Sequence, residues 1–199
     1  MEITKYVLGD YQTNCYLISY NNLAIVIDPG YESRKLVEKL NENSLDLKYI
    51  FLTHGHFDHI GGVNYLKKLF PDAKILIHQN DLIWLDENDY NLTGKKVEVD
   101  EIITSEKSLF LDDLECKIIF TPGHSSGGIS LLINEHLFVG DTLFNFSIGR
   151  TDFPFGDFQT LEKSVRKLYQ LPDTTKVYPG HGDNTTIGFE KRHNYFIKG

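Results

Sequence analysis

The stretch IFLTHGHFDHIGG (residues 50–62) places three histidines and an aspartate within the six positions from His54 to His59. The chain contains only eight histidines, so this is a strong local concentration of one residue type. The preceding run KYIFL (residues 48–52) is apolar enough for a buried β-strand, and THGH is typical of the turn that ends one. Taken alone, the cluster is either a metal site or a solvated polar turn.

Three further stretches repeat the arrangement of an apolar strand that runs into a polar turn. They are CKIIFTPGH (residues 116–124), HLFVGD (residues 136–141) and KVYPGHG (residues 176–182). Each turn carries a glycine, as expected where the backbone bends sharply. Strand ends hold side chains rigidly while turns stay open to solvent, so the four turns are good mounts for one site. The candidate donors are His54, His56, Asp58, His59, His124, Asp141 and His181.

These seven side chains offer nitrogen and oxygen donors and no sulfur. Imidazole and carboxylate suit zinc, iron and manganese, whereas structural zinc sites are usually closed by cysteine-rich sets of four ligands. Seven donors are too many for one tetrahedral ion, but two ions that share a carboxylate would use all of them and keep room for water. The donor set therefore predicts a catalytic centre with two divalent ions, with zinc preferred and iron or manganese as alternatives.

The rest of the chain alternates short strands with amphipathic helices. Helical periodicity covers residues 33–43, 61–70 and 158–171, and no linker divides the chain. We expect one α/β domain over residues 1–199, in which sheets pack together and helices cover them. Residues 86–108 are polar and weakly periodic, which indicates a loop or short insertion near the site. Strands are expected at residues 7–8, 15–19, 23–27, 48–52, 74–78, 114–120, 129–133, 136–140 and 176–178.

Composition narrows the class of partner. Hydrophobic residues make up 41% and charged residues 24% of the chain, as in ordinary globular proteins. The net charge of −8 argues against broad binding to nucleic acid or anionic membranes. Apolar runs such as LAIVI are far shorter than the roughly twenty residues that span a bilayer, and the first residues do not resemble a signal peptide. We therefore expect a cytoplasmic protein; the oligomeric state stays open.

The two cysteines and three other histidines are interpreted as structural. Cys15 and Cys116 have apolar neighbours and no C-x-x-C spacing, which indicates buried, reduced thiols. His78, His136 and His193 belong to none of the four motifs, so we interpret them as capped or solvated residues.

The motifs THGHFDH, TPGHS, VGDTLF and YPGHGD resemble, in this order, the metal-binding motifs of the metallo-β-lactamase fold superfamily. The segment GDTLFNFSIGRTDFP resembles the short, single-domain glyoxalase II-like hydrolases of that superfamily. The resemblance implies a four-layer αβ/βα sandwich, with two mixed sheets packed together and helices on the outer faces. It also implies that the metals lie at one edge.

The resemblance assigns a role to each donor. One ion would be held by His54, His56 and His124, and the other by Asp58, His59 and His181. Asp141 would bridge both ions. Asp28, in VIDPG, matches a family aspartate that accepts the free N–H of a ligand imidazole, although a simple turn-forming aspartate is the alternative.

Two divalent ions would let a bound water ionise near neutral pH, so that a hydroxide attacks a carbonyl carbon without a protein nucleophile. Asp58 is the candidate catalytic residue, because it could accept a proton while it remains a ligand. Two ions bring +4 and the two aspartates −2, which favours an anionic small-molecule substrate. The resemblance suggests a thioester such as an acyl-glutathione.

The sequence offers two sets of candidate residues for binding the thiol carrier. Family glyoxalases bind glutathione carboxylates with basic residues near the carboxyl end, where this chain has Lys191 and Arg192. An ordinary solvated helix face is the alternative for these two. Arg150 is a second candidate anchor, or else it pairs with Asp152 inside its own loop. The family often has glycine at the position of Phe146, so it is an open question whether this side chain alters the access of the substrate.

Three other functions compete with thioester hydrolysis. An iron-dependent persulfide dioxygenase shares the histidine motifs and a GRTDF segment, but Pro154 stands where that family is expected to have glutamine. A lactonase or phosphoesterase of the same superfamily would differ only in substrate. A non-enzymatic metal-binding module is disfavoured by the open coordination and the lack of cysteine ligands.

Overall fold

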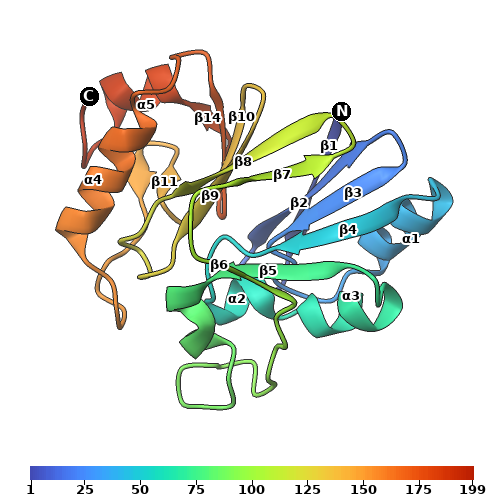
Figure 1. The fold of residues 1–199 in the computed structure, drawn as a ribbon. Coiled ribbons are helices and arrows are strands. Elements are labelled where there is room, and N and C mark those ends of the chain that lie inside the picture. Colours follow the sequence, from blue (N-terminus) through green and yellow to red (C-terminus); the bar gives the residue numbers. More distant parts are fainter. The chain divides into compact units, whose positions relative to one another are not determined.

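A computed structural model describes residues 1–199, and the chain divides into two compact units. The first unit comprises residues 1–104 and 110–114, and the second comprises residues 105–109 and 115–199. Each unit is built on one mixed β-sheet with helices (Figure 1). The chain is therefore α/β, as the sequence predicts.

The first sheet has six strands in the order β1-β2-β3-β4-β5-β6. Strands β1 to β3 form an antiparallel meander, and β3, β4, β5 and β6 are parallel. The hairpin between β2 and β3 turns at Asn21, whose φ of 54° is the left-handed conformation that asparagine tolerates. The strands are β1 (Glu2–Leu8), β2 (Thr13–Tyr20), β3 (Leu23–Ile27), β4 (Asp46–Phe51), β5 (Lys74–His78) and β6 (Glu101–Ile103).

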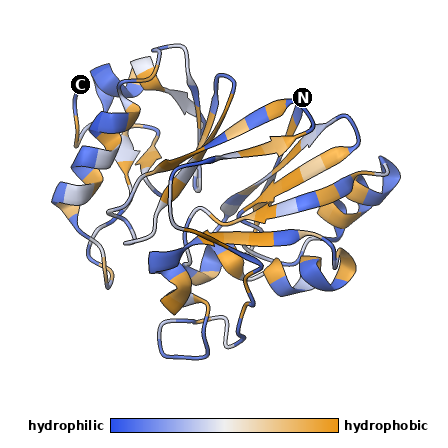
Figure 2. Ribbon diagram, in the orientation of Figure 1, coloured by the Kyte–Doolittle hydropathy of each residue, from blue (hydrophilic) through white to orange (hydrophobic).

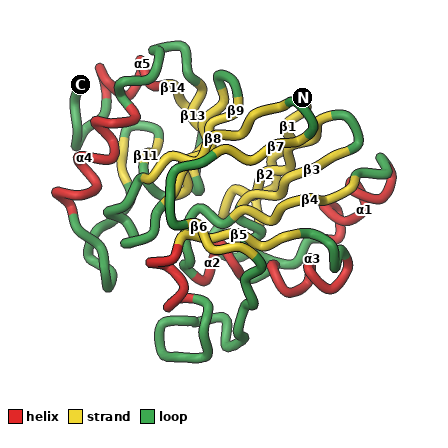
Figure 3. The backbone as a smooth tube through the Cα atoms, viewed as in Figure 1, coloured by secondary structure: helices red, strands yellow, loops and turns green.

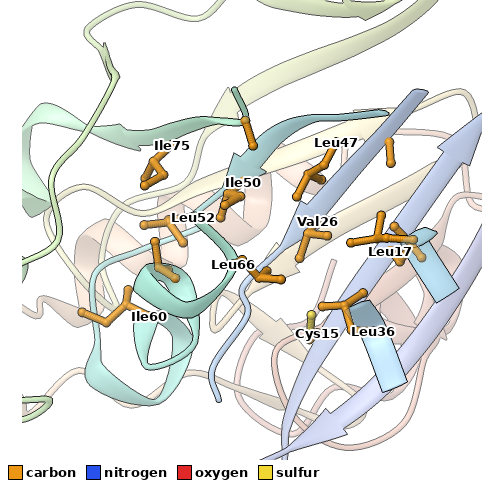
Figure 4. Close-up of a cluster of buried hydrophobic side chains, with 14 of the residues drawn as sticks. Cys15, Leu17, Val26, Leu36, Leu47, Ile50, Leu52, Ile60, Leu66 and Ile75 are labelled. Atoms are coloured by element: carbon orange, nitrogen blue, oxygen red, sulfur yellow. The ribbon is translucent and has the colours of Figure 1, made fainter. Parts of the chain in front are cut away.

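Helices α1 (Arg34–Glu42), α2 (Phe57–Ile60) and α3 (Val63–Leu69) cover one face of this sheet, and η1 (Gln79–Trp84) follows β5. Ser33 caps α1 by accepting a hydrogen bond from the backbone N–H of Leu36. In the core, Leu36 of α1 and Leu66 of α3 pack against strand residues such as Val26 (Figure 4). This packing fixes the strand ends from which the candidate metal ligands project.

The second sheet has six strands in the order β14-β13-β10-β9-β8-β7, and a small hairpin joins β11 to β12. Helix α4 (Phe158–Leu168), capped by Asp157, and helix α5 (Ile187–His193), capped by Thr186, pack on one face. The strands are β7 (Ser108–Leu111), β8 (Leu114–Phe120), β9 (Ile129–Ile133), β10 (His136–Gly140), β11 (Leu143–Phe144), β12 (Ser147–Ile148), β13 (Lys176–Pro179) and β14 (Thr185–Thr186).

Apolar residues are concentrated in the strands, and polar residues lie on the outer faces of the helices (Figure 2). In α4, Leu161, Val165 and Leu168 are buried against the second sheet at helical spacing. Most of the donor-bearing segments are loops between these elements (Figure 3). No helix has the length and apolarity needed to cross a bilayer.

The expected elements agree with most of the observed ones. The strands predicted at residues 23–27, 74–78, 114–120, 129–133 and 136–140 have the predicted bounds. The first strand is longer than predicted, since β1 begins at Glu2 rather than at residue 7, and the sequence did not predict the one-turn helix Phe57–Ile60. Residues 86–108 contain turns, β6 and the start of β7. The single-domain organisation over residues 1–199 stays a prediction.

Both cysteines are buried and reduced, as expected. Burial raises the pKa of the Cys15 thiol well above its ordinary value and that of Cys116 to about 12. The thiolate is the nucleophilic form of cysteine, so neither side chain is suited to nucleophilic catalysis at neutral pH.

Candidate metal centre

In the first unit, the donor residues follow the carboxyl ends of parallel strands. Asp28 comes directly after β3, residues 53–59 follow β4, and Asp81 lies in η1 after β5. Parallel strands end at the same sheet edge, so these polar residues meet there. The backbone N–H of Asp28 donates to the carbonyl of Phe51 at 3.1 Å, which joins the first two strand ends.

The first donor group comprises His54, His56, Asp58 and His59, and these side chains are close together. The rings of His54 and His56 have centroids 4.7 Å apart, and those of His54 and His59 are 4.1 Å apart. His59 Nε2 lies 3.6 Å from Asp58 Oδ2. The three imidazoles are buried, and Asp58 retains 14% of its side-chain exposure. The group is thus compact, with one carboxylate partly open.

Asp28 contacts one of these imidazoles directly and a second one through Thr53. His59 Nδ1 lies 2.9 Å from Asp28 Oδ2, and because a carboxylate only accepts, Nδ1 carries the proton. Thr53 donates its hydroxyl to Asp28 Oδ2 at 2.6 Å, and its Oγ1 lies 3.1 Å from His54 Nδ1. In both rings Nδ1 is therefore engaged, which leaves Nε2 as the nitrogen that could bind an ion.

Asp28 forms a turn in addition to its contact with His59, and its role beside a metal ligand stays a prediction. Its φ is 48°, and the backbone N–H of Gly30 donates to its carbonyl at 2.8 Å, so Asp28 does form a turn. Its side chain nevertheless faces inward and is 1% exposed. The carboxylate also accepts the backbone N–H of Thr53 at 2.8 Å.

Two residues that the sequence analysis did not single out hold the loop around His56. Asp81 is fully buried, and its Oδ2 accepts the backbone N–H of Gly55 at 3.0 Å. The ring of Trp84 meets the His56 ring edge-on, with centroids 4.5 Å apart. Both residues come from η1, whose short, irregular sequence gives no helical periodicity.

In the second unit, His124, Asp141 and His181 follow β8, β10 and β13, which run in the same direction. The parallel pair β10–β13 ends at the partners Gly140 and Pro179, so the two following turns are adjacent. The backbone N–H of Gly180 donates to the carbonyl of Gly140 at 2.8 Å and joins these turns.

These three residues form the second donor group, with Asp141 between the two histidines. Asp141 Oδ2 lies 3.5 Å from His124 Nε2 and 3.6 Å from His181 Nε2. His181 keeps 29% of its side-chain exposure, whereas the other two side chains are nearly buried. One carboxylate oxygen thus lies within reach of both imidazoles.

The backbone around the second donor group requires close approaches. His124 Nδ1 lies 2.7 Å from the carbonyl of Arg150, which only accepts, so Nδ1 carries the proton and Nε2 faces Asp141. A side chain at Gly149 would place its Cβ 1.8 Å from the carbonyl oxygen of Asp141. Gly123 has φ 129°, and a Cβ there would lie 2.2 Å from the backbone nitrogen of Leu161 in α4.

The candidate carrier-binding residues have partners of their own. Arg150 binds Asp152 through two hydrogen bonds of 2.7 Å, and its guanidinium lies 3.9 Å from the Phe153 ring centroid. The hydrogen bond from Arg150 lowers the pKa of Asp152 to about 2. Lys191 and Arg192 both contact Asp173, at 2.7 and 3.4 Å. As donors to a carrier, these three residues stay a prediction.

Phe146 occupies a position at which glycine would be unstrained. Its φ is 63°, in the left-handed region. The ring stacks on Tyr195, with centroids 5.3 Å apart, and meets Phe189 edge-on. The backbone N–H donates to Oε2 of the buried Glu190 at 3.0 Å. The ring therefore packs against α5 and the residues after it.

The three other histidines have structural contacts. His78 caps η1 by accepting the backbone N–H of Asn80, and burial lowers its pKa. His136 Nδ1 lies 2.8 Å from the hydroxyl of Tyr178. The ring of His193 packs on Phe189. These contacts agree with the interpretation of all three as structural residues.

The donor chemistry in both groups fits borderline divalent cations. Both groups combine imidazole nitrogens with carboxylate oxygens, and Nδ1 of His54, His59 and His124 is directed to a protein oxygen. Such contacts fix the ring and its tautomer, as in histidines that bind metals. Zinc, iron and manganese all suit this set.

Comparison with known proteins gives consistent matches along the chain. Residues 8–181 match the family model of the metallo-beta-lactamase superfamily. The hydroxyacylglutathione hydrolase GloC of Haemophilus influenzae is 38% identical to this chain, and the match covers 94% of this chain and 93% of GloC. The structure of BLEG-1 B3 metallo-beta-lactamase is similar with a TM-score of 0.92 and 37% identity, covering 100% of both chains. TTHA1623 in a di-iron-bound form is similar with a TM-score of 0.84 and 33% identity, covering 98% of this chain and 100% of the other.

Proposed function

The chain belongs to the metallo-beta-lactamase superfamily, and from this premise we propose that it is a hydrolase with a binuclear metal centre that cleaves a thioester such as an acyl-glutathione. The observation that carries the proposal is the position of Asp141. Its Oδ2 lies within 3.6 Å of two histidines that the family motifs assign to different ions. A carboxylate placed between two imidazole ligands in this way could be shared by two ions.

In this proposal the seven donors hold two divalent ions. His54, His56 and His124 would hold one, Asp58, His59 and His181 would hold the other, and Asp141 would be a ligand common to both. When bound, the ions supply an acidified water and polarise a carbonyl oxygen. Zinc is the preferred ion, and iron, which is bound in the di-iron form of TTHA1623, is the alternative together with manganese.

The chain's own residues orient the ligands and move a proton. Asp28 and the carbonyl of Arg150 fix the tautomers of His59 and His124, so Nε2 can bind an ion. Asp58 is the least buried residue of the first donor group, and its Oδ2 accepts a hydrogen bond from Thr13 at 3.2 Å. This contact holds the carboxylate in place, where it could accept a proton while it remains a ligand. The net positive charge of two ions and two aspartates favours an anionic substrate.

A substrate panel tests the reaction class. We expect the holoenzyme to hydrolyse a lactoyl-glutathione thioester to acid and free thiol, with no oxygen consumed, because water is the only co-reactant. The measurement is thiol release, followed with a chromogenic disulfide, beside an oxygen electrode. A glutathione persulfide is the matched second substrate. Oxygen uptake with the persulfide, and no thiol release from the thioester, would show that the protein is an iron-dependent dioxygenase and not a hydrolase. Turnover of lactones or phosphoesters alone would show that it is a hydrolase of another substrate class.

A further inference from the structure

A cavity of about 680 Å³ opens in the first unit beside Asp58. Its wall comes from the turn between β1 and β2, the segment after β3, helices α2 and α3, and residues 93–97. Tyr11 and Tyr31 in the wall are 64% and 61% exposed, whereas Thr13 is fully buried. The cavity therefore extends from the surface to the proposed metal ligand, and its volume is typical of small-molecule sites.

Two lysines in the wall have no ion-pair partner. Lys68 in α3 and Lys95 are exposed, and neither side chain forms a hydrogen bond or an ion pair. Their sequence neighbours differ, because Lys67 pairs with Asp100 and Lys96 pairs with Glu98. Two ammonium groups beside one cavity are thus available to anionic groups of a ligand.

The wall also carries groups of the opposite charge and aromatic surface. Asp10 and Glu32 line the same cavity, and their carboxylates form no ion pair either. Phe57 lies edge-on to Tyr11, with ring centroids 4.9 Å apart, and Tyr65 adds a further ring. Carboxylates would repel a polyphosphate, but they suit a ligand that carries an ammonium group beside its own carboxylates.

We propose that this cavity binds the thiol-carrier half of the substrate, a small peptide thiol with a free ammonium group and more than one carboxylate. Lys68 and Lys95 bind its carboxylates, Asp10 and Glu32 bind its ammonium group, and the aromatic rings pack on its backbone. The inference rests on the proposed thioester hydrolysis, because the carrier must reach the scissile carbonyl near Asp58. It assigns carrier recognition to residues other than Lys191 and Arg192, whose charges are already paired with Asp173.

Direct binding to the holoenzyme tests the cavity separately from turnover. The probe is S-methylglutathione, a thioether that cannot be hydrolysed, titrated by calorimetry. We expect Lys68→Ala with Lys95→Ala to weaken binding at least about tenfold, because two charge-assisted contacts are lost. Two control double variants remove the same charge elsewhere. Lys74→Ala with Lys96→Ala removes lysines of the same unit that do not line the cavity, and Lys191→Ala with Arg192→Ala removes the residues near the carboxyl end.

The outcomes separate the cavity from the proposed reaction. Unchanged affinity in the Lys68, Lys95 variant overturns the carrier site, as does an absence of binding to the unmodified holoenzyme. Loss confined to the Lys191, Arg192 variant moves the carrier to that helix. If thioesters are hydrolysed but the affinity for S-methylglutathione does not depend on Lys68 and Lys95, the proposed hydrolysis stands and the cavity assignment fails. If binding depends on these lysines and no thioester is hydrolysed, the cavity assignment stands and the reaction fails.

Discussion

Replacing Asp141 with asparagine is expected to lower metal occupancy at both proposed sites and to remove nearly all thioester turnover. The carboxylate oxygen that lies near both His124 and His181 would become part of a neutral amide. Changes to residues that only orient a metal ligand commonly lower metal affinity about 10- to 100-fold, and a ligand shared by two ions should exceed that range. The measurement is metal content per chain together with kcat.

Two further variants serve as a comparison and a control for Asp141→Asn. His181→Ala removes a ligand assigned to one ion, so we expect it to empty mainly that position. Asp183→Asn makes the same charge change two residues beyond His181, on an exposed side chain, and should leave metal content and kcat unchanged. Retention of both ions and normal turnover in Asp141→Asn would show that Asp141 is not the bridge.

Replacing Asp28 with alanine is expected to destabilise the protein by about 3–5 kcal/mol. The carboxylate accepts three hydrogen bonds, from the backbone and hydroxyl of Thr53 and from His59 Nδ1, and all four groups are buried. Alanine would leave three buried donors without an acceptor. The measurement is the free energy of unfolding in urea, for the metal-free and the metal-loaded protein.

Asp112→Ala is the matched control for this loss. Asp112 also has a left-handed φ, of 52°, but it is exposed and accepts a single side-chain hydrogen bond, from Asn21. The control therefore removes an aspartate from the same backbone conformation without stranding buried donors, and we expect a change within about 1 kcal/mol. Equal destabilisation by the two variants would mean that the Asp28 network contributes nothing beyond backbone conformation.

The fold class and the candidate metal ligands could be read from the sequence because both depend on local patterns of apolar and polar residues. Continuous apolar runs such as LAIVI and ISLLI predict buried strands, and strands β3 and β9 have those bounds. The same runs ended at each histidine motif, which placed the candidate ligands at strand ends. Thr186 precedes α5 and accepts the backbone N–H of Phe189, and threonine is a residue type that commonly caps helices.

The remaining features depend on contacts between residues far apart in the chain. The carbonyl of Arg150 orients His124. Every residue has a backbone carbonyl, so the residue type at position 150 does not indicate this contact. Asp173 neutralises Lys191 from 18 residues away, which no local pattern indicates. Lys68 resembles any exposed helix lysine until the structure shows the cavity that it lines. Sequence patterns thus located the donors but not the groups that hold them or the surface beside them.

The measurement that tests the binuclear account most directly is activity against metal equivalents. Enzyme stripped with a chelator is titrated with zinc, and in parallel with iron under anaerobic conditions, while thioester turnover and bound metal are measured on the same samples. We expect turnover to reach its maximum at about two bound ions per chain, because in the proposed centre the two ions share Asp141, whose Oδ2 lies near both His124 and His181. Full turnover at one bound ion, with no further gain from a second, would contradict it.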